Sequence, residues 1–402
     1  MIQNKIINFC DRIIEGCFYT LLIVVTFSTS LVEIAASLMI AAWLTKMLIK
    51  RDLRSFDSVP ARILLIFLLW TVLSCVNSAY FRESFRGVFK WTEYALIFLT
   101  VATEMRKESI VKRSLFVMAL GAGLACLNGF YQYFSGTGFI RHRQLIYQDY
   151  LRRISSAFVH PNDYGIYLVI VIIIFISLLL SRYDRLRIKL AMLTLALISA
   201  VNLFLTKSRG AWISFGGAFL ALGALKAKRV VAVFLVLLII VFIMLPYTVQ
   251  ERIFQLTDAD YGGTTWERLM LWKGTVNMIK VHPVLGFGVN TYSRNFPAYK
   301  PPGYWDVRYT HNCYLHMAAE VGIVGALLFL IFLVTVLVFS LKGIFLMPGG
   351  IRKDLSRGLF AGLVGFSMSS MVDTHLYSVN LAVFFHLLLG FCFALSYHAR
   401  KN

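Results

Sequence analysis

The chain of 402 residues is 58% hydrophobic and 15% charged, which excludes an ordinary soluble domain, where about a quarter of the residues are charged. Repeated apolar runs of about 20 residues indicate instead one integral membrane domain over residues 1–402. The net charge of +20 does not by itself indicate a nucleic-acid partner, because the cytoplasmic loops of membrane proteins are enriched in Lys and Arg.

Twelve apolar segments are candidate transmembrane helices, so the sequence predicts an all-α polytopic membrane protein. We expect the first segment to be a retained span, because it lacks a small-residue cleavage site and leads directly into a second apolar run. Residues 207–210 interrupt one helical pair, and interrupted spans tend to line cavities. The expected helices cover residues 14–29, 31–49, 62–78, 89–104, 114–134, 163–181, 189–205, 211–225, 229–247, 313–341, 358–372 and 378–396.

Basic residues recur in every second connection between these helices. The positive-inside rule therefore predicts that those connections and both termini lie in the cytoplasm. Residues 135–162, 207–210 and 248–310 are then expected on the other side of the membrane. The cations expected inside are Lys46, Lys50, Arg51, Arg54, Arg106, Lys107, Lys112, Arg113, Arg182, Arg185, Arg187, Lys189, Lys226, Lys228, Arg229, Arg352, Lys353, Arg357, Arg400 and Lys401.

The expected outer loops contain the informative polar residues. Loop 248–310 is the longest, and its aromatic content and a helix-like stretch at 266–279 predict an ordered, functional loop. Six cations lie in loops expected outside, although the positive-inside rule favours Lys and Arg in cytoplasmic loops. An anionic ligand would explain them, as would contact with lipid headgroups or water. They are Arg141, Arg143, Arg152, Arg153, Lys207 and Arg209.

Four polar clusters fall at the same outer interface in this topology. Arg209 and Arg268 can each present a planar fork of donors to phosphate oxygens. His311 can accept a proton at neutral pH, although a single interfacial histidine is also often structural. The prediction of a site therefore depends on the convergence of the clusters, which cover residues 207–212, 266–272, 282–292 and 310–325.

Three further patterns have simpler interpretations. Glu320 lies nine residues after His311, off its helical face, and is expected to pack or form an ion pair. Gly286-x-Gly288 lacks the third glycine of a dinucleotide fingerprint and predicts a tight turn. Asp258-Ala259-Asp260 is similar to a metal-binding pair, but nucleotide-sugar donors are cytosolic and this loop is expected outside. We therefore expect no metal and no cofactor.

At these clusters the sequence resembles the O-antigen ligase and polymerase superfamily of bacterial envelope glycosyltransferases. In an earlier element, His160 replaces the first Asn of a pattern usually read as Asn-Pro-Asn, which puts a role for that position in doubt. The resembling motifs are Ser208-Arg209-Gly210, Glu267-Arg268 with Trp272, His282-Pro283…Gly286-x-Gly288-x-Asn290, Thr310-His311-Asn312…Glu320-x-Gly322 and Phe158-x-His160-Pro161-Asn162-x-x-Gly165.

The resemblance implies a GT-C-like fold of about twelve transmembrane helices in the bacterial inner membrane, with loop 248–310 folded over a cavity open to the periplasm. It implies a glycan donor on undecaprenyl diphosphate and, in the ligases, an acceptor hydroxyl on lipid A-core oligosaccharide. It also implies a metal-independent reaction that inverts the anomeric centre. Membrane lipids are the remaining expected partners, and nucleic acid is not among them.

The roles that follow are catalysis by three residues and substrate binding by seven. We expect Arg209 and Arg268 to stabilise the departing diphosphate and His311 to deprotonate the acceptor hydroxyl. The expected substrate-binding residues are Lys207, Arg141, Arg143, Arg152, Arg153, His282 and Asn312.

Other functions stay open at this point. An O-antigen polymerase would use the same lipid-linked donor and is the first alternative to a ligase. A transporter of lipid-linked glycans would place ionisable residues near the bilayer midplane, where the expected spans have few. A scaffolding membrane protein would not need histidine and arginines at converging loops.

Overall fold

The structure is a computed structural model that describes residues 2–148, 151–181, 186–226, 264–304 and 309–397. These residues form thirteen α-helices, four short 3₁₀-helices and one antiparallel pair of β-strands. The helices are α1 (Ile2–Val24), α2 (Thr29–Lys50), α3 (Val59–Ser74), α4 (Phe81–Glu104), α5 (Glu108–Ser135), α6 (Pro161–Leu179), α7 (Leu186–Leu205), α8 (Arg209–Lys226), α11 (Thr264–Val281), α12 (Tyr292–Asn295), α13 (Cys313–Leu346), α14 (Ile351–Ser369) and α15 (Val379–Tyr397). The strands are β1 (Ile146–Gln148) and β2 (Leu151–Arg153).

Seven segments of the described chain are long and apolar enough to cross a membrane, namely α2, α3 with the turn that follows it, α5, α6, α7, α13 and α15. The protein is therefore an all-α polytopic membrane protein. Every expected helix within the described residues has a counterpart in the structure, whereas the expected helix 229–247 lies outside them. The four counterparts that are not among the seven apolar segments are α1, α4, α8 and α14.

Several helices extend beyond the apolar runs that predicted them. Helix α1 begins at Ile2 rather than at residue 14, and α4 begins at Phe81 rather than at residue 89. The added turns contain Lys, Arg and Glu, which are good helix formers, so helices continue where the apolar pattern stops. Asp11, in the added turns of α1, forms an ion pair: Lys46 Nζ lies 2.5 Å from Asp11 Oδ1. The same Lys46 Nζ lies 2.6 Å from Glu104 Oε2 at the end of α4.

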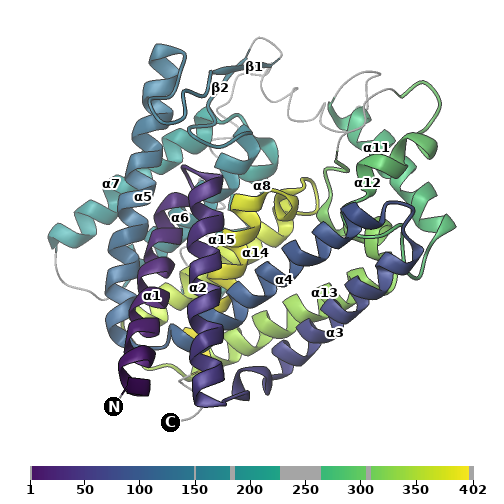
Figure 1. Cartoon of the computed structure of the whole chain (residues 1–402). Helices are drawn as coiled ribbons and strands as arrows, with labels where there is room; N and C mark the ends of the chain where they lie inside the picture. Colours follow the sequence, from purple (N-terminus) through teal and green to yellow (C-terminus); the bar gives the residue numbers. More distant parts are fainter. Residues whose placement is uncertain (1, 149–150, 182–185, 227–263, 305–308, 398–402) are drawn as a thin grey trace.

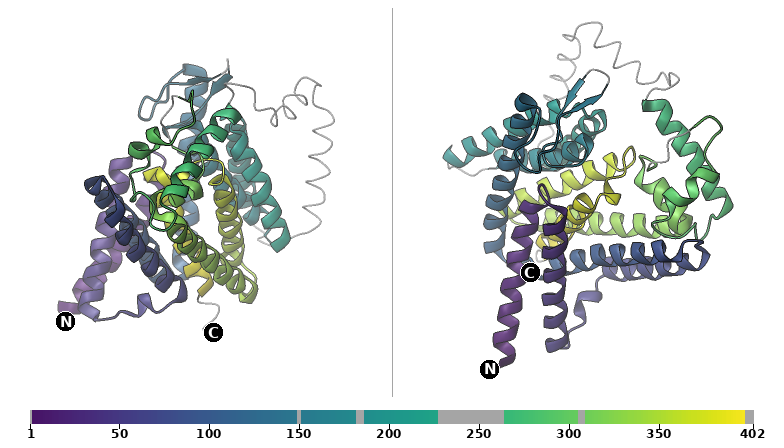
Figure 2. Two further views of the ribbon diagram at one scale, coloured as in Figure 1. Left: turned by 90° about the vertical axis from the view of Figure 1, so that its right-hand side faces the viewer. Right: turned by 45° about the horizontal axis from the view of Figure 1, so that its top comes forward.

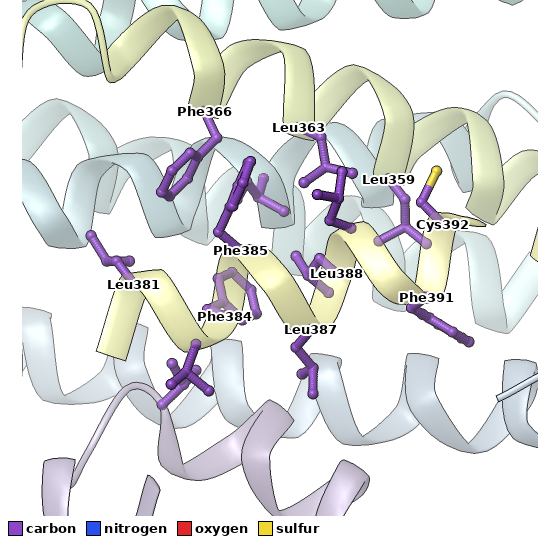
Figure 3. Packing of buried hydrophobic residues seen from close by; sticks show 14 of the residues in the cluster. Leu359, Leu363, Phe366, Leu381, Phe384, Phe385, Leu387, Leu388, Phe391 and Cys392 are labelled. Atoms are coloured by element: carbon purple, nitrogen blue, oxygen red, sulfur yellow. The ribbon is translucent and has the colours of Figure 1, made fainter. Parts of the chain in front are cut away.

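Helices α6 and α15 form the centre of the bundle. The most apolar windows of α6 and α15 are 83% and 94% buried, against 22% for α7, which presents most of its surface outward. Helix α14 packs against α6 and α8, and α15 packs against α4 and α13 (Figures 1 and 2). Figure 3 shows α14 beside α15: Leu359, Leu363 and Phe366 of α14 face α15, whereas Leu387 and Phe391 of α15 point away from α14.

Small residues allow α14 and α6 to approach closely. A Cβ atom on Gly358 would lie 2.8 Å from the Ile174 Cα, and one on Gly362 would lie 3.3 Å from the Ile170 Cα. Between helices in lipid the contact is stabilised by van der Waals packing rather than by the hydrophobic effect. The spacing Gly358-x-x-x-Gly362 thus permits close helix packing, which matters here because α6 and α14 carry residues near the site described below.

Helix α13 is broken at Gly322, where φ is 73° and ψ is 170°. The main-chain groups freed by the break find partners in residues 283–288: Phe287 N donates to Ala319 O at 3.0 Å, Gly288 N to Glu320 O at 2.9 Å, and Ile323 N to Pro283 O at 2.8 Å. Such interruptions in membrane helices persist only where the freed groups are satisfied in this way. The break therefore joins loop 283–288 to a membrane helix.

Two side chains from the α3 region complete this junction. The Trp70 indole Nε1 donates to Val321 O at 2.9 Å, and Asn77 Nδ2 donates to Gly286 O at 2.7 Å. Gly286 and Gly288 both have positive φ, 69° and 95°, so the tight turn expected at Gly286-x-Gly288 is confirmed. These contacts fix the segment with α11 and α12 to α13 and to the end of α3 (Figure 1).

We expect Gly322→Ala to lower the free energy of unfolding by about 1–3 kcal/mol from backbone strain alone, because the φ and ψ of Gly322 lie in a region that is essentially restricted to glycine. A Cβ atom there would also lie 1.8 Å from Val284 O. Gly303 has a similar φ of 77° but open space around its Cβ position, so Gly303→Ala reports the backbone cost alone. Equal losses for the two variants in thermal unfolding would contradict this account of the junction.

Candidate active site

One end of the bundle gathers residues from four parts of the chain, and we call it the site end. Helices α6, α8 and α13 begin there, α14 ends there, and the β1–β2 hairpin lies beside them (Figure 2). Arg153 of β2 connects two of these parts, because its Nε donates to Thr206 O at 2.9 Å and its Nη2 donates to Asn162 Oδ1 at 2.8 Å. Cys313 N donates to Ser370 O at 2.8 Å and so joins the start of α13 to the end of α14.

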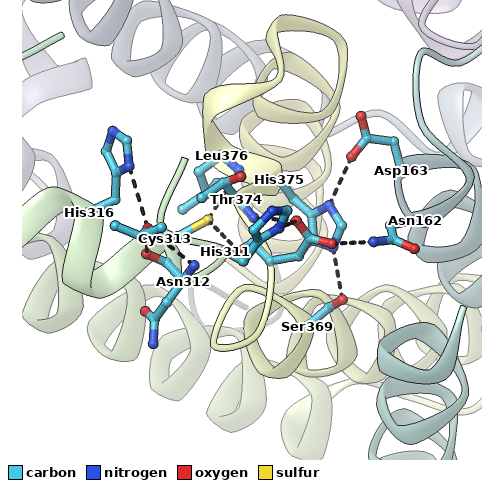
Figure 4. A network of polar contacts seen from close by, with 12 residues as sticks. Asn162, Asp163, His311, Asn312, Cys313, His316, Ser369, Thr374, His375 and Leu376 are labelled. Carbon is cyan, nitrogen blue, oxygen red and sulfur yellow. Dashed lines mark hydrogen bonds and ion pairs between the residues drawn. The ribbon is translucent and has the colours of Figure 1, made fainter. Parts of the chain in front are cut away.

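His311 lies at the entrance to α13 and contacts Asp373. Its Nδ1 is 3.0 Å from Asp373 Oδ1, and its side chain is 35% exposed against 13% for Asp373 (Figure 4). A carboxylate can only accept here, so Nδ1 carries the proton and Nε2 keeps its lone pair when the ring is neutral. The arrangement leaves the basic nitrogen of a half-exposed histidine available to a substrate.

The backbone at His311 is held in an uncommon conformation. Its φ is 49°, in the left-handed region, where a residue other than glycine costs about 1 kcal/mol or more. The next residue fixes it: Asn312 Oδ1 accepts hydrogen bonds from Tyr314 N and Leu315 N, each at 3.0 Å, and caps α13. The sequence predicts that Asn312 binds substrate. In the structure its side-chain oxygen caps α13 and so fixes the position of the neighbouring His311.

Asp373 is itself held by several groups. Asn162 Nδ2 donates to its Oδ2 at 2.6 Å, and Thr374 N donates to its Oδ1 at 2.9 Å. Burial acts to raise the pKa of Asp373, but the hydrogen bond with His311 and the nearby charges of His375, His311 and Arg268 outweigh it, and the pKa lies well below its ordinary value. Asp373 is therefore a carboxylate at neutral pH.

Arg268, on the first turns of α11, lies within electrostatic reach of both Asp373 and Arg209. Burial lowers the pKa of Arg268, the Asp373 carboxylate raises it, and the Arg209 guanidinium lowers it further. Arg209 is exposed and opens α8, directly after the turn at Lys207. The structure therefore places Arg268 within electrostatic reach of Arg209 and of Asp373, the hydrogen-bond partner of His311, although these residues lie far apart in the sequence.

The remaining expected substrate-binding residues lie in different settings. Lys207, with φ of 53°, places its Nζ 3.7 Å from the centre of the Phe204 ring. Arg153 binds the main chain and Asn162 as described, which gives it a structural contact at the site end. His282 ends α11 with its ring 4.6 Å from that of Phe287, on the side of the junction with α13.

The loop after α5 carries the other expected arginines. Arg141 and Arg152 are exposed, and Arg143 is half-buried. The loop folds back on α5, because Gln132 Nε2 donates to Arg143 O at 3.0 Å and Asn128 Oδ1 accepts from Ile140 N at 2.8 Å. Strands β1 and β2 were expected only as part of a loop; they pair from Ile146 with Arg153 to Gln148 with Leu151.

Sequence reasoning missed Asp373 and His375, and it gave Asn162 and Asp163 no role. A signal was available: Asp373-Thr374-His375 lies in the short connection between the last two expected helices, which the predicted topology puts on the same side as His311. Asn162 belongs to the Pro-Asn motif of residues 158–165, and besides Arg153 it contacts Asp373, which lies far away in the sequence. Its contact with Asp373 results from the packing of α6 against α14.

Glu320, expected to pack or form an ion pair, is buried against His316. Its Oε1 lies 3.3 Å from His316 Nε2 and accepts a hydrogen bond from Tyr292 N at 3.1 Å, and both Glu320 and His316 are buried. The expected pair Asp258 and Asp260 lies outside the described residues, as do parts of loop 248–310. The helix-like stretch expected at 266–279 is confirmed as α11.

Comparison with known proteins adds one family match. Residues 194–330 match the family described as O-antigen ligase, and the matched region includes Arg209, Arg268 and His311 but not Asp373. Among curated proteins, none matches this chain. A solved structure described as "Structural coordination of polymerization and crosslinking by a peptidoglycan synthase complex" is similar, with a TM-score of 0.45 and 16% identity, covering 84% of this chain and 97% of that one.

Proposed function

We propose, from the match of residues 194–330 to the O-antigen ligase family, that this protein transfers a glycan from undecaprenyl diphosphate to a sugar hydroxyl of lipid A-core oligosaccharide. The site end then faces the periplasm of a bacterial inner membrane, and about twelve spans place both termini in the cytoplasm. The observation that carries the proposal is the His311–Asp373 pair beside two arginines from other parts of the chain.

The chemistry needs a base and a cationic site. His311 Nε2 takes the proton of the acceptor hydroxyl while that oxygen attacks the anomeric carbon of the donor. The bond from the anomeric carbon to the diphosphate breaks, and its electron pair leaves with undecaprenyl diphosphate. Arg209 and Arg268 stabilise the charge that develops on the leaving oxygen. Attack from the face opposite the leaving group inverts the anomeric centre, and the proposed step uses no metal or cofactor.

The arginines of the loop after α5 and Lys207 supply a basic approach to this centre. Arg141 and Arg152 are exposed, as an anion-binding role requires. We assign Arg141, Arg143 and Arg152 to phosphate groups of the acceptor core and Lys207 to the diphosphate. His282 and Asn312 support the site through the junction with α13 and the cap of that helix.

In vitro transfer tests the proposal directly. Purified protein is given lipid-linked glycan with or without lipid A-core oligosaccharide, and glycan-bearing core is expected only when the core is present. Lengthened lipid-linked glycan in the absence of core would assign the protein as a polymerase. Movement of intact lipid-linked glycan across vesicles, without a covalent product, would refute both and favour a transporter.

We expect Asp373→Asn to lower the transfer rate by about 10²–10³-fold, because general-base catalysis contributes on that order. Both carboxylate oxygens accept hydrogen bonds, from His311 and Asn162, and Asn has only one acceptor oxygen to offer. If its amide donates to His311 Nδ1, the proton moves to Nε2 and the ring can no longer act as a base. Single-turnover transfer measures the loss.

The control for this variant is Asp354→Asn, which removes a buried carboxylate paired with Lys226 at 2.7 Å at the opposite end of α14. It is expected to lower stability and leave the transfer rate within about threefold. The depressed pKa of Asp373 means that its carboxylate stabilises the fold above the ordinary Asp pKa, and that this contribution is lost as the pH falls below it. The stability difference between wild type and Asp373→Asn should therefore shrink in acid, and a constant difference would contradict the assignment.

A further inference from the structure

A buried histidine, His375, lies close to the His311–Asp373 pair. His375 is 1% exposed, its Nδ1 lies 3.0 Å from Asp163 Oδ1, and its Nε2 lies 2.9 Å from Ser369 Oγ (Figure 4). Both ring nitrogens therefore have polar partners. The proposed chemistry does not use His375, and its burial keeps it from contact with either substrate.

The position of this histidine relative to Asp373 is the informative feature. Asn162 and Asp163 are neighbours on the first turn of α6, and Asp373 and His375 lie two residues apart in the turn after α14. Asn162 contacts Asp373 at 2.6 Å, and Asp163 contacts His375 at 3.0 Å. Two side-by-side polar contacts thus join the same two segments, and one of them ends on the carboxylate that orients His311.

These contacts restrict the turn in a way that one contact would not. With the Asn162 contact alone, residues 373–375 could rotate about that hydrogen bond. The second contact removes the rotation, and Cys313, whose N donates to Ser370 O and whose Sγ accepts from Leu376 N, holds the turn against α13. A buried ion pair is a weak source of stability, and its best-attested use is to fix one arrangement among several.

The charges around His375 agree with an ion pair. Burial acts to lower the pKa of His375, but the hydrogen bond with Asp163 and the charges of Asp373 and Asp163 raise it, and Arg268 lowers it, with a net rise above the ordinary value. Ser369 on α14 is the uncharged partner of the same ring. When the His375 ring carries a proton on both nitrogens, its charge also offsets the repulsion between Asp163 and Asp373.

We propose that His375 and Asp163 are positioning residues for glycan transfer: they fix the turn 373–375 so that Asp373 holds the His311 ring with Nε2 toward the acceptor. The inference rests on the proposed function, since it assigns these residues to the same site. Neither residue touches a substrate. Because these residues act on the geometry of the His311 base, their substitution is expected to lower the rate of the chemical step and to leave substrate binding unchanged.

The test compares His375→Gln and Asp163→Asn with wild type in the transfer assay. We expect kcat to fall about 10–100-fold, as a misplacement of about 1 Å at a reacting centre costs up to 10²-fold, while the KM values for donor and acceptor change less than about threefold. Asp163→Asn keeps an oxygen that can accept from the ring, so Asp163→Asn is expected to retain more activity than Asp163→Leu. The double variant should lose no more than the worse single variant, because both act through one contact.

The matched control is His386→Gln in α15. His386 is also 1% exposed, but its Nδ1 contacts only the Ala382 main-chain oxygen of its own helix at 2.8 Å. This variant reports the cost of replacing a buried histidine away from the site. Thermal unfolding of every variant is measured alongside the kinetics. If His375→Gln does not fold, the nearly isosteric Asp163→Asn tests the positioning role alone.

The outcomes separate the inference from the proposed function. Wild-type kcat in both His375→Gln and Asp163→Asn, with His311→Ala inactive, would overturn the positioning role and leave the function standing. A fall in kcat no larger than that of His386→Gln, or a rise in KM with kcat unchanged, would also overturn it. Full transfer by His311→Ala would refute the base that the positioning serves and so overturn both.

Discussion

His311→Ala is expected to reduce glycan transfer by about 10²–10⁴-fold, the range that a positioned general base contributes. The ring is half-exposed, its Nδ1 is engaged by Asp373 at 3.0 Å, and its Nε2 is the nitrogen free to take a proton. Truncation removes the proton acceptor but leaves the arginines in place. Binding of lipid-linked glycan, measured by its protection against thermal unfolding, should therefore stay within about threefold of wild type.

A second variant separates the base from the space that it fills. Gln at position 311 keeps a side-chain amide that can donate to Asp373 but has no nitrogen that accepts a proton. His311→Gln should consequently be as inactive as His311→Ala, although its fold is closer to wild type. Recovery of most of the activity in His311→Gln would rule out proton transfer and leave only an orienting role.

Arg268→Gln is expected to lower the rate by about 10²–10³-fold, which corresponds to about 3 kcal/mol of transition-state stabilisation. The guanidinium lies within electrostatic reach of Arg209 and Asp373, so it acts where a leaving diphosphate would gain charge. Gln keeps hydrogen-bonding atoms but not the charge or the planar fork of donors. The loss should appear mainly in kcat, because the charge to be stabilised develops in the transition state.

Lys273 provides the matched comparison on the same helix. It is exposed, and Lys273→Gln removes one positive charge from α11 without touching the site. Transfer by Lys273→Gln is expected within about twofold of wild type at moderate ionic strength. If both substitutions caused the same loss, a general attraction of anionic substrate to a basic surface would replace the specific role of Arg268.

The helices could be predicted because each apolar run is long, and in a membrane protein length and hydropathy decide the element. The edges could not, since α1 and α4 continue through charged residues that the apolar pattern excludes. The break in α13 was also beyond prediction. Gly322 lies inside a strongly apolar helix, and only its contact with residues 283–288 gives the glycine a reason to depart from helical φ and ψ.

The site was predictable to the extent that topology places loops on one side of the membrane. Arg209, Arg268 and His311 lie in segments that the expected topology places on the side opposite the other basic loops, and Arg268 lies within electrostatic reach of Arg209 and of Asp373, the partner of His311. Asp373 and His375 were missed because a short connection between two helices offers no pattern of its own. Their importance comes from partners on α6 and at the start of α13, and such pairings arise only when α14 packs against α6.

The break at Gly322 has a consequence for how segments outside the lipid attach to a membrane helix. An uninterrupted α-helix uses its peptide groups internally and offers only side chains to neighbours. At residues 319–323 the peptide groups instead form hydrogen bonds with the peptide groups of residues 283–288. Main-chain hydrogen bonds therefore set the register of this attachment, which fixes the position of α11, and of Arg268 with it, relative to α13.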